Sequence, residues 1–458
     1  MFILLSLPTH LPCSSEAERA LNKAMSTSFG TVALLDREGT VFKRVCFLYE
    51  LHAALARNQT TAFAAHRIDF YAALQHVDRK LRAAYALGLS DGFVMSDFRD
   101  NEANKVVREA QFPMGIVEAA VELSIQSSNA SNENDKRHIL GTFAKRDPQS
   151  HDPFTPIELA LRGRVAVAAL RCAIDDGRTG RPLYNRCLDT IKHSGLSDIT
   201  LNFSGCRGFT HETAENLAVG LPASLMGFTI YFNDVDPEVA DHFMNAISAA
   251  VPQRLRRIQK LGFISNSFGE DGGFCLSRCL RDVSPTLRSI DFGIPAPFDH
   301  PKVASAITAI RSPLKLSYCG STRMASSVLN FSGQALTVCD IILIVASAAR
   351  GVPEKLTSLD LSVNNINNEG VAALAKAIRQ NQLPDLNFID ISSNPAGNKF
   401  ELLDALKARG EKAGQDLRER AAKEGRGSPD GLIIPKFECR PGHEFKIVAV
   451  GGPPMEDD

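Results

Sequence analysis

The chain has 458 residues, of which 44% are hydrophobic, with 51 basic and 52 acidic side chains. This length exceeds what one hydrophobic core usually organises, so we expect two or three domains or an elongated repeat array. The composition is globular, which argues against disorder. A formal net charge of −1 provides no bulk field that would attract nucleic acid or an anionic membrane surface.

The cysteines and the apolar runs favour a cytoplasmic protein. The ten cysteines are scattered without a CxxC pair, which is typical of reduced core residues. Cys275 and Cys279 could share a helix face, but no nearby His or second Cys pair completes a zinc set. The opening MFILLSLP has no basic residue before its short apolar run, and no later run approaches the roughly 20 residues that span a bilayer.

Residues 1–150 are predicted to form a first domain, α/β or mostly helical. The segment TVALLD at 31–36 is typical of a buried strand, and 127–137 is a polar loop. Apolar spacing predicts helices over 41–58, 63–87 and 117–127. The residues GLSDG at 88–92 fit the G-x-S-x-G motif of hydrolases, but a helical stretch precedes them where that motif requires a strand.

The segment GTVALLDREGTVFKRVCFLYELHAAL, at 30–55, resembles part of the TIR-like domains found before leucine-rich repeats in many protist multidomain proteins. Arg44, Glu50 and Leu51 occupy places of that family's R-x-W-C-x-x-E-L helix, whereas Cys46 stands where Trp is expected. The resemblance implies a partial TIR-like α/β domain. It also implies one candidate catalytic residue, Glu50, because the glutamate of this helix cleaves the nicotinamide bond of NAD in TIR enzymes.

A polar stretch, KRDPQSHDPFTP, precedes a predicted helix over 157–174, so we place a helical linker or N-terminal cap at 151–195. The repeats begin after it. The clearest unit is LTSLDLSVNNINNEGVAALAKAI, from Leu356, with the spacing LxxLxLxxN followed by a helical pattern. Similar units begin at residues 196, 225, 258, 287, about 324, 356 and 386.

This spacing predicts a short strand, a turn and a returning helix in each unit, with the Asn side chain satisfying backbone groups where the chain turns. Helices are expected over 213–219, 239–249, 303–310 and 371–379, and a buried helix over 341–349. Phe228, Phe263 and Phe292 fall at inward strand positions. One unit cannot bury its own apolar face, but a stack of them can.

The pattern resembles the leucine-rich repeat family, specifically the ribonuclease-inhibitor type. The resemblance implies an α/β solenoid over 196–410, with parallel strands on the concave side, helices on the convex side, and a protein partner as ligand. After it, 411–458 is predicted to form a charged helical cap that includes 401–426, then two strands and a loose tail.

Side chains that flank the inward pair of each strand are predicted to point to the concave face. We expect a row of apolar side chains there with acidic residues beside it, and the alternative is that the apolar row tucks beneath a loop or the C-terminal strands. The predicted protein-binding residues are Phe203, Tyr231, Phe232, Ile294, Phe331, Val363, Asp291, Asp360 and Asp390.

The sequence therefore predicts a non-enzymatic scaffold or signalling protein that binds a protein partner and needs neither metal nor cofactor. One alternative is a regulator of a small GTPase, similar to Ran GTPase-activating proteins, in which an arginine such as Arg207 faces the bound partner. A second alternative is an NAD-cleaving enzyme that uses Glu50. His211, in HETAE, has only the first half of a zincin motif.

Overall fold

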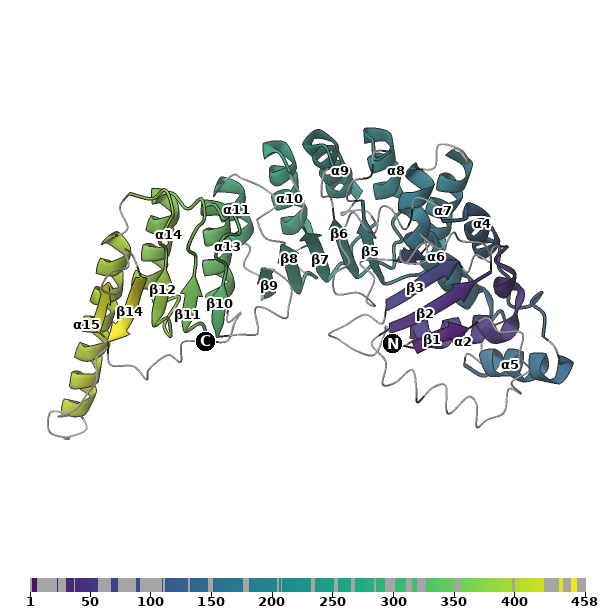
Figure 1. Cartoon of the computed structure of the whole chain (residues 1–458), viewed down its shortest axis with the longest axis horizontal. Coiled ribbons are helices and arrows are strands. Elements are labelled where there is room, and N and C mark those ends of the chain that lie inside the picture. Colours follow the sequence, from purple (N-terminus) through teal and green to yellow (C-terminus); the bar gives the residue numbers. More distant parts are fainter. Residues whose placement is uncertain are drawn as a thin grey trace, which may run out of the picture. The chain divides into compact units, whose positions relative to one another are not determined.

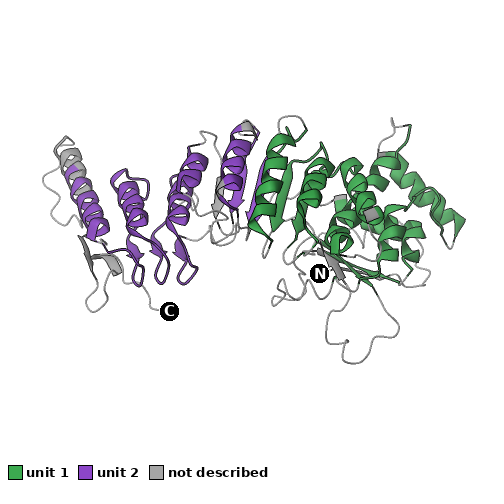
Figure 2. Ribbon diagram, turned by 90° about the horizontal axis from the view of Figure 1, so that it is seen from above, with its two compact units in different colours: residues 1–258 green, residues 259–458 purple. Residues whose placement is uncertain are grey.

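The computed structural model describes residues 2–5, 23, 30–36, 38–56, 67–72, 88–90, 109, 112–130, 132–146, 151–175, 181–203, 206, 208–231, 235–250, 254–264, 268–283, 286–292, 301–309, 315–318, 327–350, 355–397, 400–423, 436–439 and 446–450. The chain divides into two compact units, 1–258 and 259–458 (Figure 2). Both units contain strands and helices, and most of the sheet pairing is parallel. No helix in the described part is both long and apolar enough to cross a membrane.

Unit 1 begins with a four-stranded sheet in the order β1-β2-β3-β4, and β1, β2 and β3 lie side by side in Figure 1. Strands β1 (Phe2–Leu5), β2 (Gly30–Leu35) and β3 (Arg67–Ala72) run parallel, and β4 (Gly88–Ser90) is antiparallel to β3. The predicted strand at 31–36 is therefore confirmed. The predicted helix over 63–87 is wrong where the structure describes it, because β3 buries Ile68 and Phe70 by strand alternation. Short apolar runs fit both periods, so spacing alone could not decide.

The structure describes only part of the G-x-S-x-G segment at 88–92. Gly88 to Ser90 form a strand, and the preceding residues 73–87 and the following residues 91–108 lie outside the described residues. This region contains the short 3-10 helix η1 (Thr40–Lys43) and the α-helices α2 (Val45–Ala56), α4 (Met114–Val121) and α5 (Glu133–Arg146). Helix α4 thus lies earlier than the predicted 117–127, and the polar loop is shorter than predicted because Glu133 already starts α5.

Helix α6 (Thr155–Asp175) is the central helix of unit 1, as the prediction over 157–174 required. It contacts α2, α4 and α7 (Arg181–His193), and nearly every residue from Leu161 to Ala173 is buried. Gly163 permits a close approach, because a Cβ at this position would overlap Ser194. After α7, β5 (Asp198–Asn202) and β6 (Gly227–Tyr231) pair in parallel and alternate with α8 (His211–Gly220) and α9 (Pro237–Ala250).

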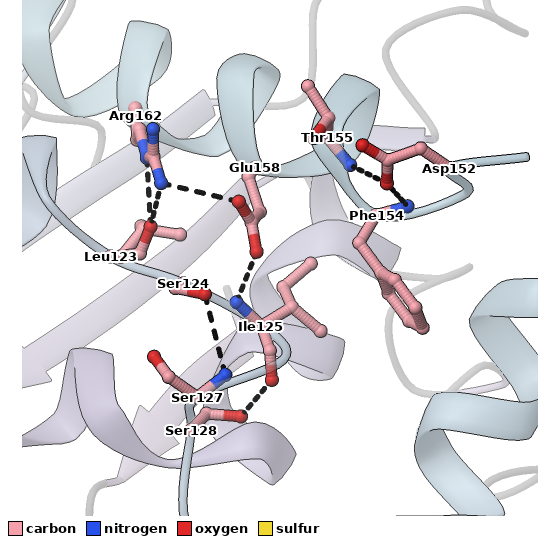
Figure 3. Close-up of polar contacts among 10 residues, drawn as sticks. All are labelled: Leu123, Ser124, Ile125, Ser127, Ser128, Asp152, Phe154, Thr155, Glu158 and Arg162. Atoms are coloured by element: carbon pink, nitrogen blue, oxygen red, sulfur yellow. Dashed lines mark hydrogen bonds and ion pairs between the residues drawn. The ribbon is translucent and has the colours of Figure 1, made fainter.

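Polar side chains of α6 bind the backbone of the turn that follows α4 (Figure 3). Glu158, itself buried, accepts a hydrogen bond from the buried amide of Ile125 at 2.6 Å. Arg162 donates through Nε to the carbonyl of Leu123 at 2.8 Å and pairs with Glu158 at 3.2 Å. The two side chains therefore satisfy a donor and an acceptor of one turn, which would otherwise be left without partners in the interior.

Unit 2 contains two groups of parallel strands (Figure 1). The first group is β7 (Lys260–Ile264), β8 (Ser289–Phe292) and β9 (Lys315–Tyr318), with α10 (Glu270–Val283) and α11 (Pro301–Thr308). The second group is β10 (Val328–Asn330), β11 (Ser358–Asp360) and β12 (Phe388–Asp390), with α13 (Val338–Ala348) and α14 (Asn368–Arg379). All seven predicted repeat strands are present. Strand β9 was not predicted.

The C-terminal elements extend the second group of strands at the edge formed by β12 and pack beside it. Strand β14 (Lys446–Val450) pairs antiparallel with β12, and β13 (Lys436–Cys439) pairs antiparallel with β14. Helix α15 (Phe400–Lys423) contacts both α14 and β13. The predicted charged helix and the two predicted strands of the C-terminal segment are thus confirmed. The expected helices over 213–219, 239–249, 303–310, 341–349 and 371–379 correspond to α8, α9, α11, α13 and α14.

The repeat core is apolar and aromatic in both units. Phe228 in unit 1, and Phe263 and Phe292 in unit 2, are at most 2% exposed, as the inward strand positions predicted. In the second group of unit 2, the side chains of two asparagines form hydrogen bonds with buried backbone groups. Asn364 donates to the carbonyls of Phe331, Leu361 and Ser362 and accepts from the amides of Gln334 and Leu336.

Asn394 repeats this arrangement one unit later. Its amide group donates to the carbonyls of Leu361, Ile391 and Ser392, and its oxygen accepts from the amide of Ile366 at 2.9 Å. Each asparagine therefore links the turn of its own strand to the turn of the preceding unit. The LxxLxLxxN spacing predicted that these side chains satisfy backbone groups at the turn, and the structure confirms it for both residues.

Asn364→Ala should lower the free energy of unfolding of the protein by about 3 kcal/mol, because it leaves buried amides and carbonyls of two neighbouring units without partners. Asn365→Ala is the matched control, since Asn365 is exposed and should change stability by no more than about 0.5 kcal/mol. Urea denaturation followed by circular dichroism measures both. Equal effects of the two variants would contradict the structural role of Asn364.

Glu158→Ala should destabilise unit 1 by about 2 kcal/mol, because the amide of Ile125 loses its acceptor and Arg162 loses its ion-pair partner. Hydrogen exchange of the peptide that contains residues 122–128 should accelerate in this variant. Glu118→Ala, at an exposed position of α4, provides the control and should leave that exchange unchanged. Protection that is identical in the two variants would show that Glu158 does not hold the turn.

Candidate functional site

The nine residues predicted to bind a protein differ in how exposed they are in the structure. Phe232 and Ile294 lie outside the described residues. Val363 is 57% exposed, whereas Phe203 and Phe331 are completely buried. Asp390 is buried as well, and the remaining three are half-buried: Tyr231, Asp291 and Asp360.

Phe331 is buried because the predicted register of its unit is shifted by two residues. Strand β10 pairs with β11 so that Val328 lies opposite Ser358 and Asn330 opposite Asp360. Phe331 therefore takes the place of the core residue Leu361, and its amide donates to the carbonyl of Asp360 at 2.8 Å. In the sequence, VLNFSG at 328–333 closely matches TLNFSG at 200–205, and this match aligns Phe331 with Phe203 and indicates the outer face for both.

Phe203 is buried for a different reason. Its register against β6 is as predicted, but the extended backbone continues one step beyond β5, and its amide donates to the carbonyl of Tyr231 at 2.9 Å. Strand alternation then puts Phe203 on the same inward side as Ile199 and Leu201. Its ring stacks on that of Phe209, with centroids 4.6 Å apart. The prediction that Phe203 and Phe331 line an open surface is wrong.

The outer face of β10, β11 and β12 consists of two other rows. Leu329, Leu359 and Ile389 form the inward row and are at most 2% exposed, so the residues on either side of them point outward. One outward row contains Val328, Ser358 and Phe388, and the second contains Asn330, Asp360 and Asp390. Val328 is 53% exposed. We call this surface, together with Val363, the outer strand face.

The turns after these strands have an unusual backbone. Gly333, Val363 and Ser393 occupy equivalent positions and have φ values of 69°, 57° and 53°. This left-handed region suits glycine and disfavours β-branched residues, so Val363 holds a strained conformation. The strain places an exposed apolar side chain beside the outer strand face, where the neighbouring units have small residues.

The aspartates of the face have their orientation fixed by these turns. Asp360 accepts from the amide of Ser362 at 2.9 Å, and Asp390 accepts in the same way from Ser392. Asn330 does the same with Ser332 at 3.0 Å. Sequence reasoning did not include Val328 among the predicted binding residues and missed Asn330, although a signal was present. Leu329, Phe331 and Gln334 reproduce the spacing of Leu359, Leu361 and Asn364, with Gln in the place of Asn.

Glu50, the second candidate, lies on α2 within unit 1. The helix packs against β2, α5 and α6, and its neighbours Tyr49 and Leu51 are buried. Burial raises the pKa of the Glu50 carboxyl to about 7. The other positions of the TIR-like motif differ in exposure, since Arg44 and Cys46 are more accessible than Leu51. A carboxyl that titrates near neutral pH is one property of a catalytic acid or base, and equally of a residue enclosed by packing.

Other sequence candidates do not form a reactive group in the described residues. Arg207 lies outside them. His211 begins α8 at an exposed position, and its ring lies 4.8 Å from that of His242, which bonds to Glu215. Cys275 is half-buried and Cys279 buried on α10. Within the described residues, no three His, Cys, Asp or Glu side chains are placed to hold a metal ion.

The raised pKa of Glu50 predicts a pH-dependent loss of stability. The unfolded carboxyl titrates near pH 4.3 and the folded one near 7, so the folded state binds more protons between these values. The stability that the protonated Glu50 carboxyl contributes is then fully present below about pH 4 and is lost as the pH rises through 7. Glu50→Gln should therefore stabilise the protein at pH 8, by about 2 kcal/mol after allowing for partial exposure, and not at pH 4.

Thermal or urea unfolding at both pH values measures this difference. Glu38→Gln, in the exposed turn after β2, serves as the control and should leave the pH profile unchanged. A Glu50→Gln effect of the same size at pH 4 and pH 8 would show that the carboxyl is not held protonated by the fold.

Comparison with known proteins found one family that matches a segment carrying part of the outer strand face. The family described as Leucine Rich repeat matches residues 352–375. These residues include β11, the turn with Val363 and Asn364, and most of α14. No curated protein matches the chain. The protein therefore contains a leucine-rich repeat element, and that element carries Asp360 and Val363.

Proposed function

We propose that this protein is a non-enzymatic interaction module that binds a protein partner on the outer strand face of residues 327–397. The observation that carries the proposal is Val363. A valine with φ of 57° costs about 1–2 kcal/mol relative to an ordinary backbone conformation, and this one is 57% exposed. Exposed apolar residues held at such a cost are typical of contact surfaces.

The finer features of this proposal rest on the repeat pattern. We infer that the seven registers belong to one leucine-rich-repeat solenoid of the ribonuclease-inhibitor type, with scaffold or signalling use in the cytoplasm. The regular asparagine contacts of Asn364 and Asn394 support this architecture, because they recur at the same place in successive units. Neither metal nor cofactor is part of the proposal.

Two enzyme-related functions are weaker candidates. A small-GTPase regulator would require an arginine that faces the partner, and no described contact supports one. An NAD-cleaving TIR-like enzyme would use Glu50, and its pKa of about 7 is the observation in favour. In that case purified protein releases nicotinamide from NAD and the Glu50→Gln variant does not, whereas the interaction module releases none.

Val363→Asn tests the proposed function, because it separates stability from binding. Asparagine tolerates the left-handed backbone far better than valine, so the variant should be about 1 kcal/mol more stable in urea. The same change removes an apolar contact and should reduce partner capture. The measurement is quantitative mass spectrometry of proteins cross-linked to the wild-type and variant chains in cell extract.

Val219→Asn is the matched control. Val219 is 56% exposed but lies on helix α8 rather than on a strand of the outer strand face. Proteins captured by the wild type should remain with this variant and be depleted with Val363→Asn. If Val363→Asn captures the same proteins in the same amounts, the outer strand face is not the binding surface.

A further inference from the structure

The outer strand face combines one accessible carboxylate with two exposed apolar side chains. Asp360 lies on β11, between the buried residues Leu359 and Leu361, so its side chain points outward. Val328 lies on the neighbouring strand, and Val363 follows Asp360 by three residues. Both valines are more than half exposed, at 53% and 57%.

The carboxylate of Asp360 has capacity for a further partner. Its Oδ1 atom accepts from the amide of Ser362, and in the described part of the chain no cation or donor contacts Oδ2. This fixed hydrogen bond holds the carboxylate in place at no further entropic cost when a ligand arrives. A charge that is oriented in advance and partly shielded from water attracts a cation more strongly than a mobile surface carboxylate does.

The residues opposite Asp360 on the two adjacent strands are not basic. Its register partner on β10 is Asn330, and its register partner on β12 is Asp390, which is only 2% exposed. Neither strand pairing therefore places a basic residue opposite Asp360, and the row is open to a cation at this accessible position.

We propose that the outer strand face binds a protein segment in which a lysine or arginine is flanked by aliphatic residues. The cation pairs with Asp360, and the aliphatic side chains cover Val328 and Val363. This inference rests on the proposed function and adds the chemistry of the partner. The apolar contacts supply most of the affinity, whereas the charge pair selects the partner and orients it.

The experiment is a selection of random 12-residue peptides, displayed on phage, against the full-length protein. Selected peptides should be enriched in a basic residue next to aliphatic ones. Their affinity, measured by fluorescence anisotropy, should fall by about tenfold in Asp360→Asn, because one charge-assisted hydrogen bond contributes about 1.4 kcal/mol or more. Affinity should also weaken as salt is raised from about 50 to 300 mM.

Asparagine at position 360 keeps an oxygen that can accept from the amide of Ser362, so the turn is retained and only the charge is lost. Asp404→Asn is the matched control, because Asp404 is exposed on α15 and should leave affinity within about twofold. Peptides that show no basic enrichment, or that bind Asp360→Asn and wild type equally, overturn the inference.

The outcome also distinguishes the inference from the proposed function on which it rests. Peptides without basic residues that nevertheless lose affinity in Val363→Asn would leave the outer strand face as a binding surface and remove only its preference for a cation. Peptides whose binding is insensitive to both variants would overturn the inference and the proposed function together.

Discussion

The side-chain amide of Asn364 is the interaction on which the second half of unit 2 depends. A strand of three residues, such as β11, is followed by an irregular turn before α14 begins at Asn368, and this turn leaves buried amides and carbonyls that no sheet or helix can satisfy. One asparagine supplies both donors and acceptor to the two adjoining turns. Because Asn394 does the same one unit later, the strands are fixed in register by side chains as well as by their backbone pairing.

The same constraint produces the outer strand face. A backbone that closes around Asn364 needs a left-handed residue just before it, which is Val363, and the equivalent positions hold Gly333 and Ser393. That residue points its side chain outward from the turn. Glycine or serine meets this requirement at little cost, whereas valine exposes an apolar group and adds strain. The candidate site is therefore a direct consequence of how the repeat closes its turn, rather than an addition to it.

The sequence predicted seven strands of the repeat region but neither β9 nor the face that the strands form. Spacing located these seven strands because their inward Leu, Ile and Phe residues alternate strictly. It misplaced Phe331 because a short similarity, LNFSG, outweighed the weaker match of Gln334 to the asparagine position, and a shift of two residues keeps the alternation intact. In the region before the repeats, β3 fitted a helical period because its few apolar residues satisfy both.

Some stabilising contacts had no sequence signal at all. Arg254, Arg350 and Arg409 each reach back to carbonyls near the end of an earlier helix or in the turn after it, for example Arg350 to Thr308 at 2.8 Å. Carbonyls at a helix end lack intrahelical partners, and a guanidinium can satisfy two of them at once.

The last repeat is held by two C-terminal contacts. Arg409 donates from α15 to the carbonyls of Leu383 and Leu386, and β14 pairs with the edge of β12. The last repeat is therefore held on its helical side and at its sheet edge. A face whose residues are held by such contacts loses little entropy on binding, and this is the condition under which a few exposed residues, here Val328, Asp360 and Val363, can provide specific recognition.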